Sequence, residues 1–145
     1  MTSPLTRRNL KLWIETVNLN RKVQADLRDR LRREFGWTLP KFQLMAMLAN
    51  HREGITMSAL ASALFLSNPN VSAMVEKLVQ EGMIKREGID GDRRSTKITQ
   101  SILGQGEFSK IMAKYQNWVN RYFEDLNDEE VKQLFHLLAK IQSAT

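Results

Sequence analysis

Two groups of polar side chains in the middle of the chain have types that suit contact with a polyanion. The stretch "SNPNVSAMVEK" places the short amides Asn68 and Asn70 at the start of an apolar periodic run, and "GDRRST" holds the adjacent arginines Arg93 and Arg94. An asparagine amide can form two hydrogen bonds with the edge of an adenine, and an arginine suits a phosphate or a narrow minor groove. These residues predict recognition of double-stranded nucleic acid.

The balance of charge supports an acidic partner without locating its binding surface. The net charge of the 145 residues is +6. Residues 1–41 contain ten Lys/Arg and four Asp/Glu, a difference that equals the whole net charge, and the remaining residues balance at twelve against twelve. A basic protein favours nucleic acid as a partner. The excess in residues 1–41 is equally typical of a solvated helix face.

Enzymatic, metal-binding and membrane functions find no support in the composition. The chain has no cysteine, and its two histidines, His51 and His136, are too few for a metal site. We find no nucleophilic triad and no glycine-rich phosphate loop, so we expect neither an enzyme nor a cofactor. No apolar run approaches the ~20 residues of a membrane span, and the N-terminus lacks a signal-peptide core. We therefore expect a cytoplasmic protein.

The elements that position the polar residues follow from apolar spacing. Residues 6–35 are predicted to form one long helix that stops at Gly36, and Pro40 begins the next. A short helix capped by Thr56 and a tight turn at "FLS" follow. A helix capped by Ser67 comes next, with one stripe facing inward and five residues left on its outer face. The inward residues are Val71, Met74, Val75 and Leu78, and the outward ones are Asn68, Asn70, Ser72, Ala73 and Glu76.

A β-hairpin and two further helices complete the prediction. "MIKRE" and "STKIT" flank the glycine-containing segment "GIDGDR", a pattern typical of a hairpin. From Ser101 apolar residues again recur at steps of three and four, and Asn127 with Glu130 resembles a capping box for the last helix. The aromatic stripe after Ser101 comprises Phe108, Tyr115, Trp118, Tyr122 and Phe123, and that of the last helix comprises Val131, Leu134, Phe135, Leu138 and Ile141.

This order of elements predicts a mainly α fold with a small β-hairpin wing, a winged helix-turn-helix flanked by terminal helices. In such a fold a helix enters the major groove, where base edges are distinguishable, and the hairpin reaches the neighbouring minor groove. The terminal helices look too apolar for a monomer of this size and must bury their stripes against something.

The central segment resembles the MarR family of bacterial transcription regulators. The resemblance rests on Leu66-Ser67, Val71-Ser72, the helix end at Leu78 and Gly82, and Asp92-x-Arg94 in the hairpin. Two flanking segments, "WTLPKFQLMAML" and "LNDEEVKQLFHLLAKI", match more weakly, so the resemblance covers nearly the whole chain. Two features depart from the family pattern. Gln100-Ser101 stands where the family has a leucine–threonine pair. The helix capped by Ser67, which would be the recognition helix in the major groove, has Lys77 as its sole basic residue.

The resemblance implies a homodimer built from residues 1–37 and 101–145, with residues 38–100 as the DNA-binding domain. It implies a regulator, usually a repressor, of pseudo-palindromic operators that is released by a small aromatic or anionic ligand. Arg94 would enter the minor groove, Asp92 could hold it extended, and Arg93 more plausibly meets phosphate. The complete set of expected DNA-binding residues is Ser67, Asn68, Asn70, Ser72, Ala73, Lys77, Asp92, Arg93 and Arg94.

Two alternatives remain open from the sequence. Trp13, Trp37, Met45 and Met112 could line the ligand cleft, although a place in the core or the dimer interface is favoured for all four. The weakly basic recognition helix also motivates a different function, a winged-helix module for protein–protein interaction without DNA binding. The arginines of the hairpin argue against that module.

Overall fold

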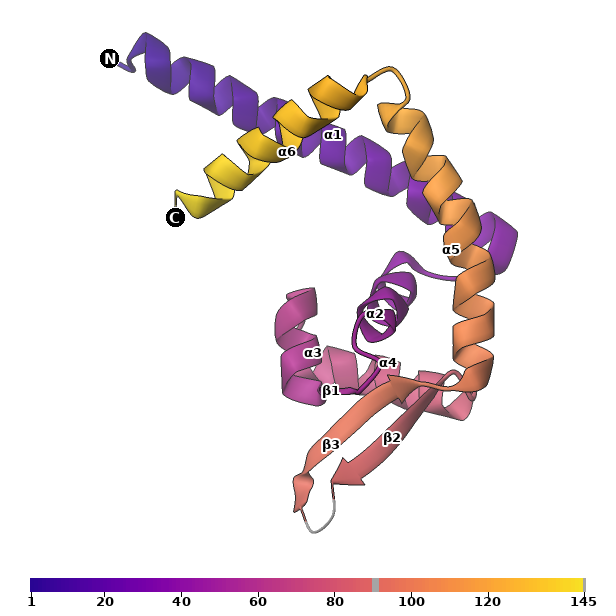
Figure 1. Ribbon diagram of the computed structural model, residues 1–145. Coiled ribbons are helices and arrows are strands. Elements are labelled where there is room, and N and C mark those ends of the chain that lie inside the picture. The colour runs from indigo at the N-terminus through magenta and orange to yellow at the C-terminus, as the bar shows by residue number, and fades with distance from the viewer. Residues whose placement is uncertain (90–91, 145) are drawn as a thin grey trace.

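The computed structural model describes residues 1–89 and 92–144, and for residues 89 and 92–95 the backbone alone. Within this part of the chain there are six helices and a small three-stranded antiparallel sheet, which lies at one end of the molecule (Figure 1). This architecture confirms the predicted fold class. The elements in chain order are α1 (Pro4–Phe35), α2 (Leu39–Ala49), β1 (Ile55–Thr56), α3 (Met57–Leu64), α4 (Asn68–Gln80), β2 (Ile84–Ile89), β3 (Asp92–Gln100), α5 (Ile102–Phe123) and α6 (Asp128–Ser143).

The long helix α1 has well-defined ends but only a partly buried body. Ser3 caps its N-terminus by accepting a hydrogen bond from the Thr6 amide at 3.1 Å, and Gly36 ends it with φ of 68°. The predicted stop at Gly36 is thus confirmed. Only Leu27 and Leu31 are buried, and both lie in the C-terminal half of the helix. The N-terminal half extends beyond the rest of the molecule (Figure 1).

Helices α2, α3 and α4 form the lower lobe around the core. The large apolar side chains Phe42, Leu44, Met45 and Leu48 of α2 are all buried. Thr56 caps α3 through the Ala59 amide at 3.2 Å, as predicted. The turn from α3 to α4 passes through Phe65, which has φ of 55° and a side chain that is 95% exposed. A positive φ is uncommon for an aromatic residue, and the sequence did not signal it.

The hairpin is confirmed, and a third strand joins it. Strands β2 and β3 pair antiparallel, with Ile84 opposite Gln100. Strand β1, which the sequence analysis missed, pairs with the other edge of β3 and sets Ile55 opposite Ile98. The side chains of Ile55, Ile84 and Ile98 are buried, so the sheet contributes to the same core as the helices.

Helix α5 connects the lower lobe to α1 through aromatic contacts. The ring of Phe42 in α2 lies 5.4 Å from that of Phe108 and stacks on Tyr115 at 4.3 Å. Further along α5, Trp118 lies 6.3 Å from Phe35 of α1. Burial raises the pKa of the Tyr115 phenol above its ordinary value. Through these contacts α5 packs against both the lower lobe and α1, and we call α5 the stem.

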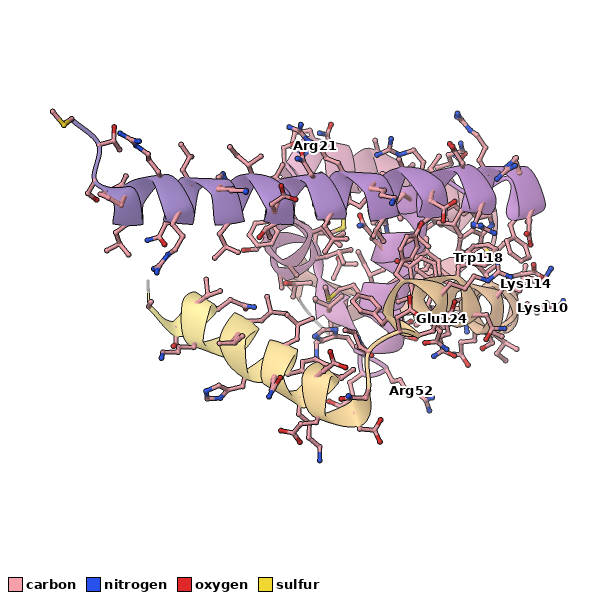
Figure 2. All side chains as sticks on the ribbon, turned by 90° about the horizontal axis from the view of Figure 1, so that it is seen from above. Arg21, Arg52, Lys110, Lys114, Trp118 and Glu124 are labelled. Atoms are coloured by element: carbon pink, nitrogen blue, oxygen red, sulfur yellow. The ribbon has the colours of Figure 1, made fainter. Side chains whose placement is uncertain are left out.

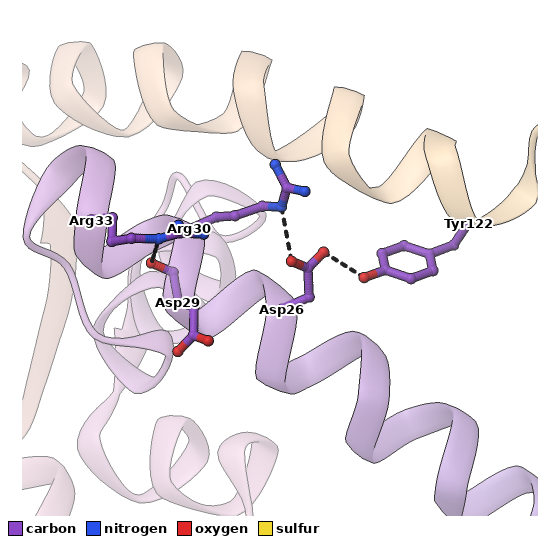
Figure 3. Close-up of polar contacts among 5 residues, drawn as sticks. All are labelled: Asp26, Asp29, Arg30, Arg33 and Tyr122. Carbon is purple, nitrogen blue, oxygen red and sulfur yellow. Dashed lines mark hydrogen bonds and ion pairs between the residues drawn. The ribbon is translucent and has the colours of Figure 1, made fainter.

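A polar contact closes the upper end of the α1–α5 packing (Figure 3). The Tyr122 hydroxyl donates a hydrogen bond to the Asp26 carboxylate, which also accepts one from the Arg30 Nε at 3.0 Å. The hydrogen bond from Tyr122 lowers the pKa of Asp26, and Arg30 adds to this effect against a smaller opposing effect of burial. The same bond raises the pKa of Tyr122.

Helix α6 packs against little of the chain to which it belongs. Its capping box is present as predicted, because Asn127 accepts from the Glu130 amide at 2.8 Å and the Glu130 carboxylate accepts from the Asn127 amide at 3.2 Å. None of its described residues is buried. Seen from above, α6 stands apart from the N-terminal half of α1 (Figure 2). None of the helices described is long and apolar enough to cross a membrane.

Candidate nucleic-acid interface

The outer face of α4 is an exposed polar surface held in place by a buried apolar stripe. Val71, Val75 and Leu78 are almost completely buried and fix the helix on the core. The residues between them point outward because side chains three and four apart share a helix face. The five predicted outward residues are all exposed, namely Asn68, Asn70, Ser72, Ala73 and Glu76, and Lys77 is exposed as well.

The N-terminus of α4 is built to tolerate a nearby anion. Ser67 is the N-cap, and its hydroxyl accepts from the Asn70 amide at 3.4 Å. Pro69 lies in the first turn, where its missing amide hydrogen costs no helical hydrogen bond. The unpaired amides and the dipole of a helix N-terminus favour negative charge. Asn68 and Asn70 therefore occupy the end of the helix best suited to approach DNA.

Strand β2 brings a cation to this surface that sequence reasoning missed. The Arg86 guanidinium forms an ion pair with Glu76 of α4, with 2.9 Å between nitrogen and oxygen. Both side chains remain substantially exposed, at 40% and 54%. The alternating pattern of "MIKRE" indicates which of its residues share a face of the strand. It does not indicate which of them lies beside α4. Arg86 is an additional candidate for phosphate contact.

The wing extends from the same lobe as α4. Asp92, Arg93 and Arg94 belong to β3, and Asp92 pairs across the hairpin with Ile89. The side chains of these three residues lie outside the described part of the chain. Their predicted roles at the minor groove and at phosphate therefore stay predictions. What the structure describes is the strand that carries them, which leads directly back towards α5 (Figure 1).

The four residues predicted as candidates for a ligand cleft lie in different surroundings. Met45 is fully buried, and Trp37 is 6% exposed beneath the Lys41 ammonium, which lies 4.5 Å from its ring centroid. Trp13 is 64% exposed on the projecting half of α1. Met112 is half-buried on α5. Trp37 and Met45 thus serve the core, which was the favoured alternative for them.

Two grooves lie between α5 and the lower lobe. One, of about 410 Å³, is largely apolar and runs between α2, the end of α3 and α5; it is lined by Phe42, Ala46, Met47, Phe65, Met112 and Tyr115 among others. The other, of about 370 Å³, lies between α2, β3 and the start of α5 and is lined by Leu48, Arg52, Gln100, Gln105, Phe108 and Ser109 among others. The second combines a cation, polar donors and an apolar floor. Among the described residues no group of three or more His, Cys, Asp or Glu could hold a metal ion.

A three-helix unit with an exposed polar third helix, followed by a β-hairpin, defines the class of winged helix-turn-helix proteins. The comparisons with known proteins point to one family within this class. Residues 37–96 match the MarR family.

The relatives that support this assignment are themselves named as transcriptional regulators. The chain is 32% identical over 90 residues to the HTH-type transcriptional regulator BilQ of Clostridium symbiosum, an alignment covering 62% of each protein. It is 25% identical over 126 residues to the HTH-type transcriptional repressor MdtR of Bacillus subtilis, covering 87% of this chain and 80% of that one. The crystal structure of a MarR family transcriptional regulator from Silicibacter pomeroyi superposes with a TM-score of 0.80 at 25% identity, covering 99% of both chains.

Proposed function

We propose that this protein is a dimeric transcription regulator that binds a pseudo-palindromic operator as a repressor. The observation that carries the proposal is the polar outer face of α4, exposed beside a wing whose strand contains two adjacent arginines. Asn68 and Asn70 would read base edges, and Ser67 would lie next to phosphate. Ser72, Ala73 and Lys77 would complete the contact along the groove. The match of residues 37–96 to the MarR family supports this assignment, as do relatives of the chain that are named as transcriptional regulators.

The dimer would be formed by residues 1–37 and 101–145, leaving residues 38–100 to bind DNA. Two features support this division. The large apolar side chains of the N-terminal half of α1 are exposed, namely Leu5, Leu10, Leu12, Trp13, Ile14 and Leu19. Those of α6 are exposed as well, namely Leu134, Phe135, Leu137, Leu138 and Ile141. Two amphipathic helices with uncovered apolar faces are expected to cover each other across a two-fold axis.

A gel shift with DNA from the region upstream of the gene tests the DNA-binding function. We expect a discrete complex that survives an excess of random DNA, because base contacts add to the sequence-independent attraction. Rising salt should weaken the complexes with operator DNA and with random DNA alike, because both depend on phosphate contacts. Binding that is equally weak on every sequence, or absent, would instead favour the protein–protein module.

The release of DNA by a small aromatic acid is the second part of the proposal. The groove beside Arg52 supports it. The Arg52 guanidinium could pair with the carboxylate of such a ligand, while Leu48 and Phe108 would contact its aromatic ring. A thermal-shift screen of aromatic acids should find compounds that stabilise the protein and weaken its complex with DNA. Arg52→Ala should lose the response. Arg21→Ala, on the opposite side of the molecule, should keep it (Figure 2). Ligands that bind tightly yet leave DNA affinity unchanged would contradict a regulatory groove.

A further inference from the structure

A single serine joins the segment that follows α4 to the N-terminal end of α5. The Ser101 hydroxyl donates a hydrogen bond to the Gly82 carbonyl and accepts one from the Gly104 amide at 2.9 Å. The Ser101 amide donates to the Met83 carbonyl at 3.0 Å. Ser101 is the cap of α5, and at 8% exposure it is the single buried polar side chain among the described residues. We call Gly82, Met83, Ser101 and Gly104 the α4–α5 joint.

The joint brings two backbones closer together than a side chain would allow. A β-carbon placed on Gly104 would lie 2.0 Å from the Met83 carbonyl oxygen and 3.2 Å from the Met45 Cε. Gly104 therefore permits the first turn of α5 to rest directly on the segment that follows α4. The negative end of the α4 dipole meets the positive end of the α5 dipole at this point, which favours the contact.

Gln100 ties the same point to a third helix. Its side-chain Nε2 donates to the Met45 carbonyl at 2.8 Å, in the middle of α2. The carbonyl oxygen of a residue inside a helix already accepts a hydrogen bond from the amide four residues on. Gln100 therefore donates to the second lone pair of the Met45 carbonyl oxygen. The polar residue that departs from the family pattern in the sequence thus has a specific partner. Residues 100–104 join α2, α4 and α5 at one place.

This arrangement gives α4 a direct connection to α5 that bypasses the wing. Along the chain, the route from α4 to α5 runs out through β2 and back through β3 (Figure 1). The joint closes that excursion at its base, and the ion pair of Arg86 with Glu76 is a second link, from the wing itself to α4. A displacement of α5 must carry α4 with it unless hydrogen bonds of the joint break.

We propose that Ser101 and Gln100 are positioning residues for DNA recognition, which lock α4 and α2 to α5 so that the recognition helix follows every movement of the stem. The inference rests on the proposed function, because only a protein that reads DNA with α4 gains from such a lock. It assigns a role to Ser101, which touches neither DNA nor a ligand in the proposal, and a second role to Gln100, which also lines the proposed ligand groove. Their effect would be on the geometry of α4 and on the affinity for an operator of fixed half-site spacing.

Distances between spin labels on the two helices test the lock directly. The chain has no cysteine, so Gln80→Cys in α4 and Lys110→Cys in α5 allow two specific labels. Both positions are exposed. Labelled protein diluted into an excess of unlabelled protein reports the distance within one chain. We expect one narrow distance distribution in the otherwise unaltered protein and a broader one in Ser101→Ala and in Gln100→Leu.

Operator affinity and a matched control separate positioning from stability. Each variant should lose operator affinity about tenfold, the equivalent of about one lost hydrogen bond in the productive geometry. Thr56→Ala removes a hydroxyl cap of the same kind from α3, a helix outside the joint, and should lower the melting temperature without broadening the distribution. Gln100→Leu keeps the inference testable if Ser101→Ala fails to fold.

The two proposals fail in different ways. Distributions in Ser101→Ala and Gln100→Leu as narrow as that of the unaltered protein would overturn the lock, as would operator affinities that stay unchanged in both variants. If the unaltered protein binds no DNA, the proposed function fails, and the distance distributions still decide whether the joint holds α4 to α5.

Discussion

At the scale of single residues, Asn70 offers the sharpest test of base recognition. Its side chain is exposed on the first turns of α4, while its backbone amide is already bonded to Ser67. Replacement by alanine therefore leaves the cap intact and removes the amide alone. Asn70→Ala should lose discrimination at one position per half-site by roughly 1–3 kcal/mol and barely change non-specific affinity. Binding curves on the operator and on single-base variants measure this. Equal losses on specific and random DNA would assign Asn70 a positioning role.

The two arginines of the wing should fail differently when replaced. Arg93→Ala should weaken binding to all sequences alike and reduce the slope of affinity against salt by about 1, because a phosphate contact is lost. Arg94→Ala should do the same and also lose preference for narrow, A·T-rich flanks. In a regular strand residues two apart share a face, and we propose that Asp92 holds Arg94 extended. Asp92→Ala should therefore weaken binding. Tighter binding would indicate simple removal of a repelling charge.

The contact between Tyr122 and Asp26 predicts a definite dependence of stability on pH. A carboxyl with a lowered pKa contributes stability that is present above its unfolded value, about 3.9, and is lost as pH falls through the folded value. A phenol with a raised pKa contributes below its unfolded value, about 10, and loses this as pH rises through the folded value. Tyr122→Phe should therefore cost about 0.5–1.5 kcal/mol between pH 5 and 9, by denaturant titration. The difference should shrink below about pH 4 and above about pH 10.

A matched variant separates this contact from general acid sensitivity. Asp26→Asn removes the charge while keeping the shape of the side chain, so it should remove most of the difference caused by Tyr122→Phe in a double-mutant cycle. A cost of Tyr122→Phe that is the same at pH 3.5 and pH 7 would show that the hydroxyl stabilises the protein through something other than Asp26.

At the scale of elements, the sequence predicted most of what local chemistry determines. The caps at Thr56, Ser67 and Asn127, the stop at Gly36 and the buried stripe of α4 are confirmed because each depends on neighbours within one or two turns. Strand β1 was missed because its two residues precede α3 directly and become a strand only by pairing with Ile98 and Lys97. Pairing between distant segments leaves little trace in so short a run.

The parts of the site that could not be predicted depend on tertiary contacts. Gln100 was recognised as unusual, yet its acceptor is a main-chain carbonyl of α2, and the sequence carries no signal for which carbonyl has a free lone pair nearby. Arg86 was visible as a basic strand residue, but its approach to Glu76 requires the hairpin to lie against α4. For Trp13, Trp37, Met45 and Met112 the sequence favoured the core or the dimer interface over a ligand cleft, and Trp37 and Met45 do lie in the core. Residue types alone carried no signal that Trp13 is exposed on α1 or that Met112 lines an apolar groove.

Two glycines of α5 provide an internal comparison at this scale. Gly104→Ala places a β-carbon against the Met83 carbonyl oxygen, which is main chain and cannot give way without moving the joint. Gly106 lies two residues on with open space around its β-carbon position. Gly104→Ala should destabilise the protein by at least about 2 kcal/mol through overpacking. Gly106→Ala should stabilise it by up to about 1 kcal/mol through helix propensity. Chemical denaturation of both variants measures this, and similar free energies of unfolding would contradict a close contact at the joint.

At the scale of the whole molecule, burial is unevenly distributed. The core gathers in the lower lobe, the C-terminal half of α1 and most of α5, whereas α6 buries none of its described residues and the projecting half of α1 keeps its large apolar side chains exposed. The basic residues of 1–41, except Lys41, lie on the same helix α1. A soluble monomer rarely leaves such extended apolar surface uncovered. The uneven burial supports the proposal that a second copy covers α6 and the projecting half of α1. The proposed operator, with half-sites about one DNA turn apart, would require the same two-fold symmetry.

The dimer proposal makes a measurable prediction at Phe135, which is 70% exposed in the middle of α6. Light scattering at micromolar concentration should give a mass near twice 16.8 kDa. Phe135→Glu puts a charge into the proposed interface, where leaving it unpaired is costly, and should yield a monomer. The monomer should keep the helical circular dichroism of a folded lower lobe but lose operator binding, because each lobe then contacts one half-site alone. Phe65→Ser removes an even more exposed phenylalanine from the lower lobe and should leave the mass unchanged. A monomeric unaltered protein that still binds a full operator as one unit would overturn the two-fold assembly.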